Sequence, residues 1–207
     1  MSTDHYYQLE SAIETLQDLI KKYKNIENIE IEIRLGIIED SKFNSGLNSE
    51  QFYSKIKEQL NTCKQWNKVE EIESKEQING NIKKIENNYI CKKKLETIDF
   101  NFKGTPYDFR ISVCTETPIK VNKFNPNLIR KKNRTSYYYK ECRFDLTKVE
   151  IENNDEIIEN EEFEIELLNL NSNTSDLYRA HSALLKIYDV INICEEIKSS
   201  AKLIKII

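Results

Sequence analysis

The feature that most constrains the fold is an alternation of side chains that occurs twice, in IEIEIRLG (residues 29–36) and in EEFEIELL (residues 161–168). Successive side chains of a β-strand point to opposite faces, so each segment predicts a strand with one apolar and one charged face. The charged residues are Glu30, Glu32 and Arg34 in the first segment and Glu162, Glu164 and Glu166 in the second. Three carboxylates in a row repel one another on a solvent-exposed face. We therefore expect cations or basic groups opposite them.

Two segments between these strands carry complementary charge. In RKKNRTS one face holds Arg130, Lys132 and Arg134, and in RFDLT one face holds Arg143, Asp145 and Thr147. For any one of these strands alone, a solvated charged face is the simpler explanation. Together they favour a closed barrel, in which the apolar faces pack outward against helices and the charged faces line a polar interior. Carboxylate oxygens suit Mg²⁺ or Mn²⁺, and Arg and Lys suit an anion, so such an interior fits a polyphosphate.

The remaining sequence predicts helices on either side of a run of strands. Apolar residues at three- and four-residue steps predict an N-terminal helix over about 5–24 and a C-terminal helix over about 174–198. A further helix is expected to begin at Asn48-Ser49-Glu50. The strands expected between turn residues are approximately 68–78, 81–87, 89–100, 107–116, 128–139, 142–150 and 158–168. Short connections predict an antiparallel meander.

The expected fold class is therefore α+β, mainly β. We expect a closed antiparallel eight-stranded barrel, or tunnel, over about 29–168, flanked by α-helices, within a single domain that spans residues 1–207.

Composition excludes several classes of protein. The net charge of −4 argues against a protein that coats duplex nucleic acid, because such binding depends on a basic surface. No run of about 18 apolar residues and no secretory start is visible, so no membrane association is expected. The five cysteines are odd in number and scattered, which is typical of reduced thiols in a cytosol-like compartment. None is placed by sequence beside a base, which argues against a cysteine phosphatase.

In their order and internal spacing, the four charged segments resemble those of the triphosphate tunnel metalloenzymes. The resemblance is to the metal-dependent RNA 5′-triphosphatases of fungal, protozoan and large DNA virus mRNA capping. It implies hydrolysis of the γ-phosphate of 5′-triphosphate RNA ends, and of NTPs, with Mg²⁺ or Mn²⁺. The compact meander and the start at Met1 favour the large DNA virus type. The resemblance also implies a chain in the cytoplasm or virion that is joined to or associated with a guanylyltransferase. Separately, the acidic net charge predicts few contacts with RNA beyond its 5′ end.

The resemblance also implies roles for individual residues. Glu30 and Glu32 would be metal ligands, with Glu166 or Glu164 as a third. A carboxylate such as Glu164 or Glu162 would orient the attacking water. Asp145 would hold a metal-bound water, and Arg143 would contact a phosphate or a neighbouring carboxylate. The expected phosphate contacts are Arg34, Arg110, Arg130, Lys132 and Arg134, with Lys120 or Lys123 as a further basic residue.

Two other interpretations remain open at this point. Thiamine triphosphatases, inorganic triphosphatases and class-IV-type adenylyl cyclases share the tunnel but carry out different chemistry. A non-enzymatic β-barrel interaction module would also have charged faces, all of them solvated. It predicts that alanine at Glu32 or Glu166 changes stability by only a few tenths of a kcal/mol.

Overall fold

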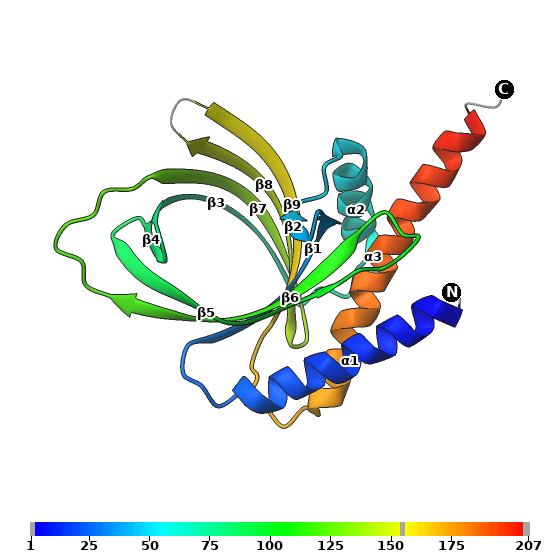
Figure 1. Ribbon diagram of the computed structural model, residues 1–207, viewed down its shortest axis with the longest axis horizontal. Helices are drawn as coiled ribbons and strands as arrows, with labels where there is room; N and C mark the ends of the chain where they lie inside the picture. Colours follow the sequence, from blue (N-terminus) through cyan, green and yellow to red (C-terminus); the bar gives the residue numbers. More distant parts are fainter. Residues whose placement is uncertain (1–2, 154–155, 205–207) are drawn as a thin grey trace.

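An antiparallel sheet of nine strands dominates the part of the chain described by this computed structural model, residues 3–153 and 156–204, with side chains for 5–152 and 156–195 (Figure 1). The strands are β1 (Ile29–Glu39), β2 (Lys42–Ser45), β3 (Lys68–Asn79), β4 (Ile82–Ile85), β5 (Asn88–Phe100), β6 (Asp108–Ile119), β7 (Leu128–Tyr139), β8 (Cys142–Asn153) and β9 (Glu156–Leu167). The helices are α1 (Thr3–Tyr23), α2 (Glu50–Thr62) and α3 (Asp176–Ile204). All of the predicted helices and strands are present.

Eight of the strands close into a barrel. Their order is β1-β6-β5-β4-β3-β7-β8-β9, and β1 pairs with β9 to complete the ring. Glu32 of β1 lies opposite Glu166 of β9, and Arg34 lies opposite Glu164. The two alternating segments are therefore neighbours at the closure. The prediction of a closed eight-stranded antiparallel barrel is confirmed.

The predicted single meander is wrong. Strands β3 to β6 form one meander and β7 to β9 form another, and β3 pairs with β7 along almost its whole length. The connection 120–127 carries the chain across from β6 to β7, which are not neighbours. Strand β6 also runs past its predicted end at residue 116, because Pro118 still lies opposite Ile90 in the ladder with β5.

Gly36 marks the place where β1 changes partners. Residues 32–34 pair with β9, whereas residues 36–39 pair with β2, a short strand that the sequence analysis did not foresee. A Cβ atom at Gly36 would lie 2.3 Å from the carbonyl oxygen of Asn44 and 2.6 Å from the ring of Phe43. Only glycine fits at this position, because β2 packs directly against the backbone of β1 there.

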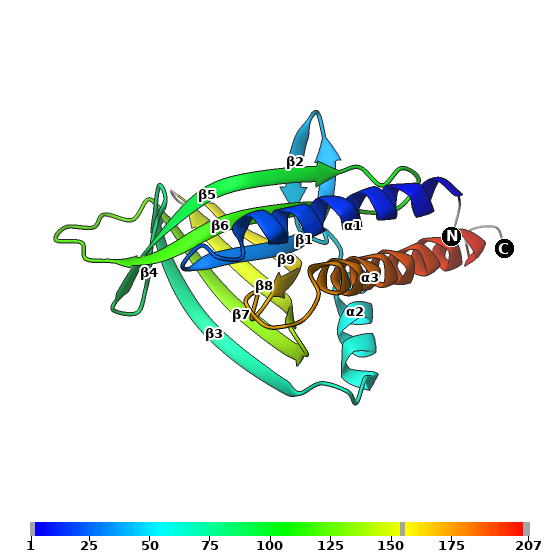
Figure 2. The same ribbon diagram turned by 90° about the horizontal axis from the view of Figure 1, so that it is seen from below.

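The hydrophobic core lies between the outside of the barrel and the helices. Helices α1 and α3 run alongside each other on one side of the barrel (Figures 1 and 2). Their apolar faces bury the outward side chains of β1, including Ile31, Ile33 and Leu35. The isoleucines of IEIEIRLG therefore point away from the tunnel, as predicted. Within the described residues, no helix has the length and apolar character needed to span a bilayer.

Candidate active site

The inward faces of the barrel strands enclose a polar cavity of about 830 Å³, here called the tunnel. Charged side chains from β1 and from each of the strands β3 to β9 reach it, because alternate residues of each strand point inward. Its charged lining residues are Glu30, Glu32, Arg34, Glu76, Lys83, Lys92, Lys94, Arg110, Glu116, Arg130, Lys132, Arg134, Arg143, Asp145, Glu164 and Glu166. The acidic faces of β1 and β9 therefore point into the barrel and not toward solvent.

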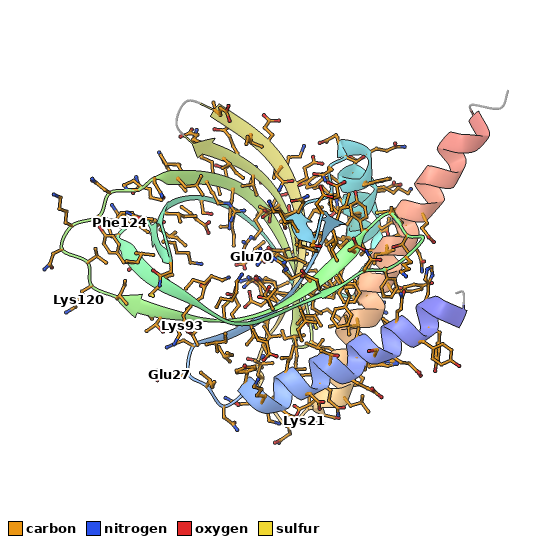
Figure 3. The ribbon with its side chains drawn as sticks, in the orientation of Figure 1. Lys21, Glu27, Glu70, Lys93, Lys120 and Phe124 are labelled. Carbon is orange, nitrogen blue, oxygen red and sulfur yellow. The ribbon has the colours of Figure 1, made fainter. Side chains whose placement is uncertain are left out.

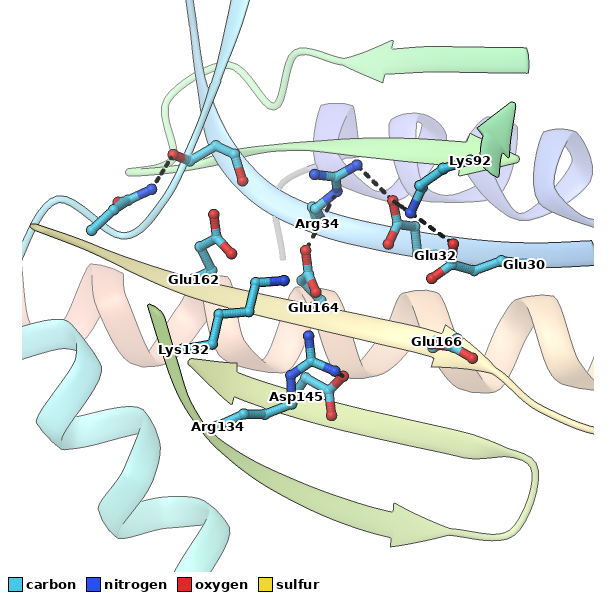
Figure 4. A network of polar contacts seen from close by, with 12 residues as sticks. Glu30, Glu32, Arg34, Lys92, Lys132, Arg134, Asp145, Glu162, Glu164 and Glu166 are labelled. Atoms are coloured by element: carbon cyan, nitrogen blue, oxygen red, sulfur yellow. Dashed lines mark hydrogen bonds and ion pairs between the residues drawn. The ribbon is translucent and has the colours of Figure 1, made fainter. Parts of the chain in front are cut away.

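Carboxylates gather on one side of the tunnel around Lys92 of β5. The ammonium nitrogen of Lys92 lies 2.7 Å from Glu30 Oε2, 3.3 Å from Glu116 Oε1 and 3.7 Å from Glu32 Oε1. Glu30 and Glu32 raise the pKa of Lys92 against the effect of burial, so its ammonium form persists. The cluster therefore already holds one cationic group (Figure 4).

The electrostatics of these carboxylates favour a further cation. Burial, followed by repulsion from Glu32, raises the pKa of Glu30 to about 7. Burial also raises the pKa of Glu166; Arg143 opposes this, and the charges of Asp145 and Glu32 reinforce it. In the described part of the chain, no three Asp, Glu, His or Cys side chains are grouped as a ready metal site, and the oxygens of Glu32 and Glu166 point to Arg34 and Arg143. The donor set is nevertheless all carboxylate, which is the chemistry of Mg²⁺ and Mn²⁺ sites.

Three basic residues of β7 project into the tunnel, and each is held by a carboxylate. An Nη atom of Arg130 lies 2.8 Å from Glu162 Oε1, and Lys132 Nζ lies 3.0 Å from Glu76 Oε1. Arg134 Nη1 lies 3.2 Å from Asp145 Oδ2. This side of the tunnel presents a row of fixed cationic groups, which can neutralise the oxygens of a bound polyphosphate.

Asp145 is the anchor of a second basic pair. It is almost fully buried and accepts a hydrogen bond of 2.6 Å from the hydroxyl of Ser136. Arg143 Nε lies 3.0 Å from Asp145 Oδ2, and Arg143 also reaches Glu166 Oε2 at 2.6 Å. Asp145 therefore orients the guanidinium groups of Arg134 and Arg143, and Arg143 links the basic and acidic sides.

Glu164 lies between cationic groups from both sides of the tunnel. Arg34 Nε is 3.6 Å from Glu164 Oε1, and in Figure 4 the side chain of Lys132 extends alongside it. Burial raises the pKa of Glu164, but Arg34 and Lys132 outweigh it, so the net shift is downward. Glu164 is therefore an ionised acceptor at neutral pH that faces the centre of the charged network.

Three of the predicted site residues, Glu162, Lys120 and Lys123, are not among those that line the cavity. Glu162 is buried and bound to Arg130 but does not line the cavity. Lys120 is exposed on the connection after β6, and neither it nor Lys123 lines the tunnel. Arg110 does line it and makes a two-pronged contact with Asp99, with Nε 2.6 Å from Oδ1.

Five charged tunnel residues were not predicted from the sequence: Glu76, Lys83, Lys92, Lys94 and Glu116. Lys83 lies 2.7 Å from Glu116 Oε1, and with Lys92 it lowers the pKa of Glu116 to about 2 despite burial. The alternation around Glu116 was a usable signal, since it lies six residues beyond Arg110 on the same strand and therefore on the same face.

Comparison with known proteins identifies the family. The family model described as "mRNA capping enzyme, beta chain" matches residues 51–183, which is more than half of the chain. The chain belongs to this family. The family model covers the strands from β3 to β9, and therefore includes the basic strands and the last acidic strand, but not β1.

Individual relatives agree with this assignment. The mRNA-capping enzyme subunit beta of Cryptococcus neoformans is 38% identical over 80 residues, a match that covers 38% of this chain and only a fifth of the relative's length. The structure of the S. pombe Pct1 RNA triphosphatase superimposes with a TM-score of 0.71 at 16% identity, covering 90% of this chain and 92% of Pct1. Pct1 in complex with the Spt5 CTD gives a TM-score of 0.69 at 17% identity. These structural matches show a shared tunnel fold.

Proposed function

We propose that this protein is an RNA 5′-triphosphatase that removes the γ-phosphate of 5′-triphosphate RNA, the first step of mRNA capping, and that it also hydrolyses NTPs. The observation that carries the proposal is the tunnel itself, in which a carboxylate cluster faces a row of Arg and Lys side chains across one cavity of about 830 Å³. Membership of the capping enzyme beta chain family supports the RNA substrate.

The basic and acidic residues of the barrel have different roles in this reaction. Arg130, Lys132 and Arg134 bind the oxygens of the triphosphate and stabilise charge on the transferred group. Ionised Glu164 accepts a hydrogen bond from a water molecule and orients it in line with the γ-phosphorus. The water oxygen bonds to phosphorus and the bond to the β–γ bridging oxygen breaks, so that this oxygen stays on the diphosphate end. One proton of the water remains on the inorganic phosphate and the other is released to solvent. Glu162, held by Arg130, supports this strand rather than touching the water.

A divalent cation fits the opposite side of the tunnel. We propose that Glu30, Glu32 and Glu166 hold Mg²⁺ or Mn²⁺, because their oxygens are hard ligands and the pKa values of Glu30 and Glu166 are raised in a cluster that lacks sufficient positive charge. When bound, such a cation supplies charge neutralisation at the γ-phosphate. Lys92 Nζ lies 2.7 Å from Glu30 Oε2 and is therefore adjacent to this proposed ligand set.

Family membership also supports a proposal about partners. The family is named for one chain of the capping enzyme, so we propose that this chain acts together with a guanylyltransferase that receives the diphosphate end. The large DNA virus type and the location in the cytoplasm or virion stay predictions, since the relatives described above are fungal. Copurification of a tagged copy with guanylyltransferase activity from its host tests the association.

The activity is tested by measuring phosphate release from triphosphate RNA, ATP, thiamine triphosphate and tripolyphosphate with Mg²⁺ and with Mn²⁺. We expect the highest kcat/KM for RNA. Glu32→Gln removes one carboxylate charge from the tunnel and should lower kcat/KM by about 100-fold or more. Glu159→Gln is the matched control, because Glu159 is exposed on β9 and outside the tunnel.

The outcomes separate the competing functions. Preference for thiamine triphosphate or tripolyphosphate, or formation of cyclic AMP from ATP, would assign the tunnel to another enzyme of the superfamily. A folded Glu32→Gln variant with unchanged hydrolysis would contradict the site assignment. Absence of hydrolysis of every substrate by the wild-type protein would favour a non-enzymatic module.

A further inference from the structure

Basic residues are concentrated at one end of the barrel. The segments 79–94 and 117–127 together carry seven lysines and a single glutamate, in a chain whose net charge is −4. We call them the basic lobe. It comprises the β3–β4 turn, β4, the first half of β5, the end of β6 and the connection to β7. Figure 3 shows Phe124 and Lys120 of this lobe at the end of the molecule farthest from the helices.

The lysines of the lobe fall into two groups according to their partners. Lys83 and Lys92 are both ion-paired with Glu116. Among the residues that the structure describes, five other lysines of the lobe have no carboxylate oxygen within 4.0 Å, namely Lys84, Lys93, Lys94, Lys120 and Lys123. Their charge is not neutralised locally, so it is available to a polyanion.

Aromatic side chains lie among these lysines. The rings of Tyr89 and Phe124 meet edge to face with their centroids 5.4 Å apart, and both side chains are partly exposed. Lys84 Nζ lies 5.7 Å from the centroid of Tyr89. An aromatic pair bordered by unpaired lysines is the combination that binds single-stranded nucleic acid, in which bases stack on rings and phosphates contact ammonium groups.

The lobe is continuous with the tunnel. Gly80, Lys83 and Lys94 of the lobe line the tunnel as well. The connection after β6 is fixed to the same end of the barrel, because Asn79 Nδ2 donates to the carbonyl of Asn125 at 2.7 Å and Asn127 donates to the carbonyl of Ile78 at 2.9 Å. A chain whose 5′ end lies in the tunnel can therefore leave over the lobe, which adjoins it.

We infer that the basic lobe binds the RNA chain immediately behind the triphosphate, with its lysines on the RNA phosphates and Phe124 and Tyr89 against a base. The inference rests on the proposed triphosphatase function. It differs from the expectation drawn from net charge, because the positive charge of this chain is gathered where the RNA leaves the tunnel. The site selects triphosphate ends that carry RNA over free NTPs.

The test compares two triple variants that remove the same charge. Lys84→Gln/Lys93→Gln/Lys123→Gln alters the lobe, and Lys42→Gln/Lys64→Gln/Lys103→Gln alters exposed lysines elsewhere. We expect the lobe variant to lose about tenfold in kcat/KM for a 20-nucleotide triphosphate RNA at low salt and to keep wild-type kcat/KM for ATP. Loss of three phosphate contacts should flatten the slope of log(kcat/KM) against log[salt] by about 2. The control variant should match wild type on both substrates.

The outcomes separate failure of this inference from failure of the proposed function. Wild-type protein that hydrolyses no triphosphate RNA would overturn both. Equal kcat/KM for a triphosphate dinucleotide and the 20-nucleotide RNA, or equal losses by the lobe and control variants, would overturn only the inference. A 20-nucleotide 5′-hydroxyl RNA should inhibit the wild-type reaction more strongly than polyglutamate of equal charge. Equal inhibition by polyglutamate would indicate an acidic protein segment as the occupant and overturn it.

Discussion

The two faces of the barrel wall carry the same residue types with different consequences, and Lys131 and Lys132 show this most directly. Lys132 points into the tunnel, is 10% exposed and lies 3.0 Å from Glu76. Lys131 points outward, is 46% exposed and lies 2.7 Å from Glu150. The two lysines are neighbours in sequence, and both are ion-paired. Their environments therefore differ in desolvation rather than in the presence of a partner.

The difference in desolvation determines how much each ion pair contributes to stability. An exposed pair such as Lys131 with Glu150 contributes little to stability, because solvent screens it. Burial lowers the pKa of Lys132, and Glu76 opposes this shift. Two charges held in a desolvated tunnel cost free energy that the ion pair only partly offsets. Such a cost is typical of a site that is arranged for a ligand rather than for stability.

The largest effect on activity is expected from removing a charge on the inner face. Lys132→Gln removes a cation that faces the triphosphate, so kcat/KM for triphosphate RNA should fall by about 100-fold or more. Lys131→Gln removes the neighbouring charge from the outer face and should leave kcat/KM within about twofold of wild type. Steady-state kinetics on both folded variants measures this, and equal losses would contradict the distinction between the faces.

The sequence predicted the inner face best where the alternation is strict. In β1 and β9 every second residue is charged and the residues between are apolar, so the face of Glu32 and Glu166 could be deduced. In CKKKL three consecutive lysines do not reveal which of them point inward, and the ladder with β6 shifts register just beyond them, between Lys94 and Glu96. Lys92 was missed for these reasons.

Other misses have equally local causes. β3 reads KVEEIESKEQIN, with carboxylates on both faces, so Glu76 did not stand out. Lys120 or Lys123 was expected as a phosphate contact from the family resemblance, and the structure places Lys120 on the exposed connection after β6. The pairing of β3 with β7 connects segments about 60 residues apart, which short-range patterns do not encode.

An intermediate effect is expected from the apolar outer face. Ile33 of β1 is fully buried against the helix side of the barrel, so Ile33→Ala leaves a cavity and should lower the free energy of unfolding by about 2–5 kcal/mol. Ile158→Ala on β9 is the control, since Ile158 is 54% exposed and should change the free energy by less than about 0.5 kcal/mol. Urea denaturation of both variants gives the comparison, and similar losses would show that Ile33 does not hold the barrel to its helices.

The smallest effect is expected from an acidic pair on the outer face. Glu161 neighbours Glu162 in sequence but lies on the other face of β9, where it contacts Glu50 of α2 and Lys148 of β8. Burial, together with a hydrogen bond to Glu50, raises the pKa of Glu161 to about 7. An unfolded glutamate has a pKa of about 4.3, so the native state binds this proton more tightly than the unfolded state does.

The free energy of unfolding should therefore fall as the pH rises from about 4.3 to about 7, because Glu161 loses its proton beside Glu50. Glu161→Gln imitates the protonated form at every pH. We expect it to exceed wild type by about 1 kcal/mol at pH 8, a value reduced for screening by solvent and Lys148, and the gain should shrink as the pH falls to 5. Urea denaturation across this range, with Glu159→Gln as the exposed control, measures it. A gain that does not change with pH would show that Glu161 is ionised throughout, and that charge on the outer face is as well solvated as the exposure of Lys131 suggests.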